Sequence, residues 1–283
     1  MKPSADTRIS TPPLLSIFIL SAAALAYEVL LIRMLSVVHW HHFATMVISI
    51  ALLGYGVSGS ITSAFRQHML DNYDRYFLLN TLLFSVSAIG CYIIVQQMPL
   101  NTLEILWDIT QWQRLIASYL LLTLPFFFVA NAIVLTLMQF HTRAAMVYGI
   151  DLIGAGIGAL AIMLLLQYFS TEMTVRLLAA GGLLAALLPV AGLTAHRKTT
   201  IAALLASSCL LILIPGKWLE TIPSEYKGLS QILQVKNTKI NSTHTSSVSQ
   251  VDVVSSPFVP LRHAPGLSLQ SPAAPPEQLA VFR

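Results

Sequence analysis

Three ionisable residues stand inside long apolar stretches of this sequence: Glu28, Arg33 and Asp151. A charged group in hydrocarbon is costly, so it is kept where it is paired, solvated or functional. Glu28 and Arg33 lie about 140° apart on a helix, which makes them poor partners for each other. We therefore expect each to meet another segment, with Asp151 as the partner of Arg33. The cluster would form either a polar substrate pathway or a structural ion pair, and Arg33 could instead extend to the interface.

A glycine-rich segment, 54–59, reads GYGVSG and matches the phosphate-binding pattern G-x-G-x-x-G. It lies inside an apolar stretch of spanning length with no strand before it, and small residues at this spacing let membrane helices approach closely. We therefore interpret it as a packing motif, and a later apolar stretch carries a similar pair. The expected packing residues are Gly54, Gly56, Gly59, Ser60, Gly154 and Gly158.

The remaining residue types indicate no further chemistry. Cys91 and Cys209 both lie in apolar segments, which supports neither a disulfide framework nor a zinc site. No combination of nucleophile, base and orienting group stands out. The net charge of +4 comes from Lys and Arg scattered singly, without the basic stripe of a nucleic-acid binder. We expect no catalytic, cofactor-binding or metal-binding residue and no nucleic-acid partner.

The composition places these residues in a lipid bilayer. Hydrophobic residues make up 55% of the 283 residues and charged ones only 10%, against roughly 25% charged in soluble proteins. The mean hydropathy is +0.72, which one buried core cannot account for. The sequence predicts an all-α polytopic bundle of six or seven spans followed by a small β-rich polar segment. The expected spans are 14–38, 43–65, 76–95, 115–138, 146–168, 175–193 and a short seventh, 200–214.

Positive residues between the spans predict the orientation. Most flank the first span's start and the ends of the second, fourth and sixth spans, whereas the opposite side shows only Arg114 and Arg176. We expect a cytoplasmic N-terminus. With seven spans the tail would lie outside the cytoplasm, and with six spans it would lie inside. The sequence leaves homo-oligomerisation open.

The composition changes at Pro215, so we predict two domains, a transmembrane bundle over 1–215 and a polar unit over 216–283. Segments 231–235, 239–242 and 249–254 are short and rich in β-branched residues, which predicts strands.

Six segments in succession resemble a known family of bacterial membrane proteins, in which a hydrophobic bundle is joined to a spermidine synthase-like (polyamine aminopropyltransferase-like) domain. They are 26–33 (AYEVLLIR), 52–60 (LLGYGVSGS), 151–158 (DLIGAGIG), 224–229 (SEYKGL), 251–257 (VDVVSSP) and 262–269 (RHAPGLSL). The resemblance implies a bacterial inner-membrane protein whose polar unit is the small β-stranded N-terminal subdomain of an aminopropyltransferase.

In that family a Rossmann-like domain follows, which would bind S-adenosylmethionine or its decarboxylated form. Nothing after Gly266 supplies the Gly-rich turn that such a domain needs, so we expect a truncated, non-catalytic portion. It would anchor, or supply substrate to, a separate or lost aminopropyltransferase-like domain. The alternative is a small transporter of a polyamine or related cation, with Glu28 and Asp151 as its acidic ligands.

Overall fold

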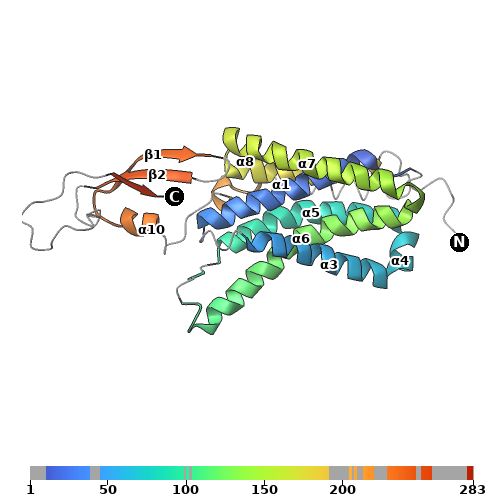
Figure 1. The fold of residues 1–283 in the computed structure, drawn as a ribbon, viewed down its shortest axis with the longest axis horizontal. Coiled ribbons are helices and arrows are strands. Elements are labelled where there is room, and N and C mark those ends of the chain that lie inside the picture. The colour runs from blue at the N-terminus through green and yellow to red at the C-terminus, as the bar shows by residue number, and fades with distance from the viewer. Residues whose placement is uncertain are drawn as a thin grey trace, which may run out of the picture.

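Six long apolar helices form the main body of the computed structural model (Figure 1). The structure describes residues 11–38, 45–98, 100–101, 104–190, 204–205, 207–208, 213–219, 228–246, 250–256 and 279–282. Each of the six is long and apolar enough to cross a membrane, which confirms the predicted bundle. The helices are α1 (Leu14–Val38), α3 (Met46–Ala64), α5 (Tyr73–Gln96), α6 (Ile109–Gln139), α7 (Ala144–Tyr168) and α8 (Thr171–Val190). Most of the expected seventh span, 200–214, lies outside the described residues.

Shorter helices complete the helical part. They are α4 (Arg66–Asp71), the 3-10 turns η2 (His141–Arg143) and η3 (Gly216–Trp218), and α10 (Gly228–Leu233).

The helices pack in two groups that meet along α5 and α8. Helix α1 packs against α7 and α8, and helix α6 packs against α3 and α5. In Figure 1 the first group occupies the upper part of the bundle and the second the lower part. Direct contact between α1 and α3, and between α6 and α7, is sparse.

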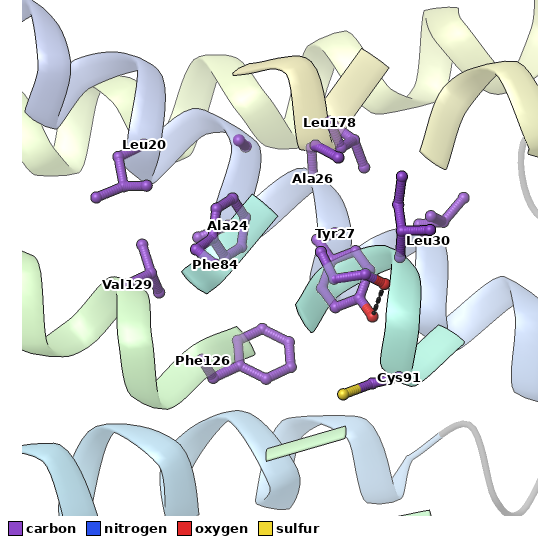
Figure 2. Packing of buried hydrophobic residues seen from close by; sticks show 14 of the residues in the cluster. Leu20, Ala24, Ala26, Tyr27, Leu30, Phe84, Cys91, Phe126, Val129 and Leu178 are labelled. Carbon is purple, nitrogen blue, oxygen red and sulfur yellow. Dashed lines mark hydrogen bonds between the residues drawn. The ribbon is translucent and has the colours of Figure 1, made fainter. Parts of the chain in front are cut away.

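An aromatic cluster fills the centre between the two groups (Figure 2). The Tyr27 ring of α1 stacks edge-on against Phe84 at 6.4 Å and lies 5.8 Å from Phe126. The Tyr27 hydroxyl donates a 2.8 Å hydrogen bond to the Ala88 carbonyl, so its polar end is satisfied inside the core. Burial of these rings joins α1, α5 and α6.

The outer faces are apolar as well. On α7, Leu152, Ile157 and Leu160 are 47–68% exposed, although they belong to one of the six apolar helices. Such a surface is compatible with lipid and not with water, so these faces contact the bilayer.

Helix α6 begins well before it joins the bundle. Its first half runs away from the other helices (Figure 1), and Trp112 and Ile116 there are about half exposed. Asp108 caps its N-terminus by accepting a 2.9 Å hydrogen bond from the Thr110 amide. This hydrogen bond lowers the pKa of the Asp108 carboxyl, because it stabilises the ionised form. Pro125 lies inside α6, close to where its packing against α3 begins.

The tail contains a three-stranded antiparallel sheet in the order β1-β2-β3. Its strands are β1 (Lys239–Thr245), β2 (Gln250–Ser255) and β3 (Leu279–Phe282). The Thr243 hydroxyl donates to the Asp252 carboxylate at 2.6 Å across the first pair. The strands predicted at 239–242 and 249–254 are confirmed.

The strand predicted at 231–235 is wrong, because α10 covers most of it and a turn comes next. Asn237, at a φ of 65°, takes the left-handed conformation in that turn. In a short apolar run, the spacing of the apolar residues does not distinguish a helix from a strand. Strand β3 was missed because its four residues come after a Pro-rich stretch.

Candidate functional site

Glu28, Arg33 and Asp151 lie on two neighbouring helices, α1 and α7. These helices run parallel, since Gly154 lies against Phe18 and Gly158 against Ala22. Side chains at the same depth along the two helices can therefore contact each other. Glu28 and Asp151 are half-buried, and Arg33 is buried with 6% of its surface exposed.

Asp151 contacts α1 near the start of both helices. Its carboxylate accepts a hydrogen bond from the Ser21 hydroxyl. Ser21 is itself buried, so the carboxylate reaches into the interface between α1 and α7.

Arg33 lies near the other end of the same interface. Its guanidinium donates to the Leu166 carbonyl of α7 at 3.4 Å. Arg33 comes twelve residues after Ser21, which is about 18 Å along the helix. The expected pairing of Arg33 with Asp151 is therefore wrong, because the parallel register places the two residues at different depths.

Glu28 and Asp151 share a third neighbour, Tyr55 of α3, which lies within electrostatic range of both carboxyl groups. Glu28 comes seven residues after Ser21, so the two residues point about 20° apart and lie about 10 Å apart along α1. The Tyr55 ring packs edge-on against Phe126 of α6 at 6.3 Å. Tyr55 is 37% exposed and lies where direct contact between α1 and α3 is sparse.

The expected packing residues separate into two sets. A Cβ added at Gly54 would come within 2.7 Å of the Phe126 Cβ, and one at Gly154 or Gly158 would collide with the α1 backbone. These three glycines allow close contact between helices, because a side chain at any of them would meet the neighbouring helix.

The other three expected packing residues do not pack against other helices in the described part of the chain. Open space lies beside Gly56 and Gly59, and Ser60 is exposed with its hydroxyl bonded to the Gly56 carbonyl at 3.0 Å. The expectation that Gly56 and Ser60 serve helix packing is therefore wrong for contacts among the described residues. The face of α3 that packs on α6 carries Gly54 and Ser58, because Ser58 is one helical turn beyond Gly54.

A polar layer that the sequence did not predict crosses three helices. The Thr62 hydroxyl of α3 donates to the Asn131 side chain of α6, whose amide donates to the Asn80 side chain of α5 at 3.3 Å. All three side chains are buried. Amide and hydroxyl side chains within apolar spans are the signal that could have found it.

The described residues do not fit an S-adenosylmethionine-type cofactor. A dinucleotide-type fold places a Gly-rich turn between a parallel strand and a helix. The sheet at 239–255 and 279–282 is antiparallel, and the glycines of 54–59 lie within a continuous helix. Groups of three or more His, Cys, Asp or Glu side chains able to hold a metal do not occur in the described part of the chain.

No family model, curated protein or solved structure matches the chain. The fold and the site together define a polytopic helical membrane protein with two carboxylates inside its bundle.

Proposed function

We propose that this chain is the membrane-embedded, non-catalytic portion of a spermidine synthase-like protein. It anchors a separate aminopropyltransferase-like domain and supplies that domain with a cationic substrate. The resemblance of the six sequence segments supports the family part of this proposal. The observation that carries the substrate part is the placement of Glu28 and Asp151 on the packed helices α1 and α7, where both are half-buried and the Asp151 carboxylate reaches Ser21 of α1.

The chemistry of this arrangement favours an organic cation. Carboxylates within a bilayer need a counter-charge, and an ammonium group supplies it together with hydrogen-bond donors. Glu28 and the Asp151 contact at Ser21 are about 10 Å apart along α1, which suits two ammonium groups on one extended chain. The Tyr55 ring adds a face on which a cation can rest.

The second candidate is a small transporter that moves a polyamine or related cation across the membrane. The carboxylates of Glu28 and Asp151 also favour a transporter, because they come from two different spans and lie at different depths. The two candidates differ in the fate of the bound cation: the first passes it to a neighbouring domain and the second releases it on the other side.

Binding of radiolabelled spermidine to the full chain in lipid nanodiscs tests the shared step. We expect Glu28→Gln and Asp151→Asn each to weaken binding about tenfold, which corresponds to roughly 1.4 kcal/mol for one charge-assisted contact. Glu104→Gln is the matched control, because Glu104 is an exposed carboxylate outside the spans. Equal affinity in all four proteins contradicts the assignment of these carboxylates.

Proteoliposomes then separate the two candidates. Spermidine that binds but does not accumulate inside favours the supply of a neighbouring domain, and accumulation that the double variant abolishes favours transport. Transfer of an aminopropyl group by the purified chain alone contradicts the non-catalytic assignment. A reporter fused after Lys217 shows on which side the tail lies.

A further inference from the structure

Helices α3 and α7 carry the same sequence pattern at an interval of 100 residues. Six of the nineteen positions of α3 are identical in α7, and neighbouring positions pair Leu with Ile and Val with Ile. The identical pairs are Met46 and Met146, Val47 and Val147, Ile50 and Ile150, Leu52 and Leu152, Gly54 and Gly154, and Gly56 and Gly156.

The structure buries equivalent positions of the two helices. Val47, Gly54, Ser58 and Thr62 lie buried along one face of α3. Their equivalents at an interval of 100 are buried along α7, namely Val147, Gly154, Gly158 and Ile162. The repeated sequence therefore forms a repeated packing face.

The helices against which these faces pack, α6 and α1, also correspond to each other. The glycine of α3 lies against Phe126 and Phe127 of α6, and the glycine of α7 lies against Phe18 of α1. Buried positions of α1 recur in α6 at an interval of 109. These pairs are Ser16 and Pro125, Ile17 and Phe126, Leu20 and Val129, Ser21 and Ala130, Ala23 and Ala132, Ala26 and Leu135, and Tyr27 and Thr136.

The third helices complete the correspondence. Helix α5 packs on α6, as α8 packs on α1, and α5 and α8 pack on each other. At their contact Gly182 lies against Phe84 and Ser85. Every major contact in the bundle thus has a counterpart under exchange of α1, α3 and α5 with α6, α7 and α8. The contact between α5 and α8 maps onto itself and marks the position of a pseudo-two-fold axis.

Each unit has three spans, an odd number, so the first helix of the second unit enters from the opposite side of the bilayer. The second unit is therefore inverted relative to the first. Inverted repeats are the architecture in which two halves exchange conformations around a site at their interface. Here the repeats are interlocked, since the second helix of each unit packs on the first helix of the other.

We propose that 14–96 and 109–190 are inverted three-helix repeats, and that the bundle transports its cation by alternating access. The inference rests on the second candidate of the proposed function, a transporter whose cation site includes Glu28 and Asp151. The moving bodies are α1, α7 and α8 on one side and α3, α5 and α6 on the other, with the contact between α5 and α8 as the pivot. Glu28 and Asp151 belong to the first body and Tyr55 to the second, so the motion opens and closes the site.

At one end of the bundle, residues of the two bodies line a small apolar pocket. The pocket lies where α1 and α5 end and where α3 and α6 begin. Leu35 of the first body lines it together with Met46, Val95 and Leu122 of the second. The first half of α6 runs away from the bundle at this same end (Figure 1).

Side-specific thiol labelling tests the proposal on the full chain. In a background of Cys91→Ala and Cys209→Ala, Tyr55→Cys places one thiol between the two bodies while both carboxylates stay. A membrane-impermeant maleimide is applied to right-side-out and to inside-out vesicles. We expect the thiol to react from both sides, and saturating spermidine to raise the rate on one side and lower it on the other by about threefold. Leu52→Cys is the control, because Leu52 is 64% exposed on the outer face of α3 and should react from neither side.

Each outcome decides a different claim. Reaction from one side only, or from neither, with and without spermidine, overturns alternating access and leaves the cation site standing if spermidine still binds. Reaction from both sides without a spermidine effect supports the motion and contradicts the assignment of spermidine as the ligand. Reaction from both sides with a steady leak of a small dye overturns the proposal in favour of an open channel. If Tyr55→Cys does not fold, Ala155→Cys at the equivalent position of α7 carries the same test.

Discussion

The Ser21 hydroxyl of α1 donates a hydrogen bond to the Asp151 carboxylate of α7, and this contact joins two parallel helices. Because Ser21 is buried, its loss leaves the carboxylate without a partner on α1. We expect Ser21→Ala to lower the free energy of unfolding by about 1 kcal/mol, as for other hydrogen bonds between membrane helices. Thermal unfolding in detergent measures this change.

A double-mutant cycle with Asp151→Asn isolates the contact. A coupling energy of about 0.6–2 kcal/mol between the two positions is expected. Additive effects of the two substitutions show that Ser21 and Asp151 do not interact in the folded protein.

The close approach of α1 and α7 depends on Gly158. A side chain at this position meets the backbone of Ala22, which cannot move aside as the end of a flexible side chain would. We expect Gly158→Val to prevent a stable bundle, observed as aggregation in size-exclusion chromatography. Gly156→Val is the matched control, since open space lies beside Gly156, and this variant should elute as the parent does.

The sequence predicted the spans well because a continuous apolar run of about 20 residues is rare outside membrane-spanning helices. It predicted the start of α6 about six residues too late, because Trp112, Gln113 and Arg114 interrupt the apolar run before Leu115. In the tail, the segments are short and their hydrophobic periodicity is weak, so their secondary structure was harder to predict. The segment that forms α10 was predicted as a strand.

The site was predicted only in part, for a physical reason. The cost of charge in lipid selects Glu28, Arg33 and Asp151 from the sequence alone. Which of them meet depends on the register between α1 and α7, and this register is set by Gly154 and Gly158 against the α1 backbone. A sequence pattern identifies a packing face but not the depth at which a neighbouring helix meets it.

The buried layer of Thr62, Asn131 and Asn80 is expected to hold α3, α6 and α5 in register. Asn131→Leu removes the central member and leaves the Thr62 hydroxyl and the Asn80 oxygen without this partner. We expect a loss of about 1–3 kcal/mol, because buried polar groups without partners are costly. Chemical denaturation in mixed micelles measures it. Ser60→Ala, which removes an exposed hydroxyl of α3, should change stability by less than about 0.5 kcal/mol; equal losses in both variants exclude a structural role for the layer.

Adjacent glycines of α8 should respond in opposite ways to the same substitution. A Cβ at Gly182 would come within 2.8 Å of the Phe84 ring and still closer to the Ser85 hydroxyl, whereas one at Gly181 would rest 3.4 Å from the Ala23 Cβ. We expect Gly182→Ala to lower the free energy of unfolding by about 1–3 kcal/mol through overpacking. Gly181→Ala should leave it equal or raise it, because alanine favours a helix by about 1 kcal/mol over glycine.

Combining Gly182→Ala with Ser85→Ala tests whether the loss arises at the contact between α5 and α8. Removing the Ser85 hydroxyl takes away the nearest obstacle to the new methyl group, so part of the lost stability should return. The ring of Phe84 stays in place, and the recovery should therefore be incomplete. If Gly182→Ala is as stable as the parent protein, α5 and α8 are not in close contact at this point, and the pivot assigned to them loses its basis.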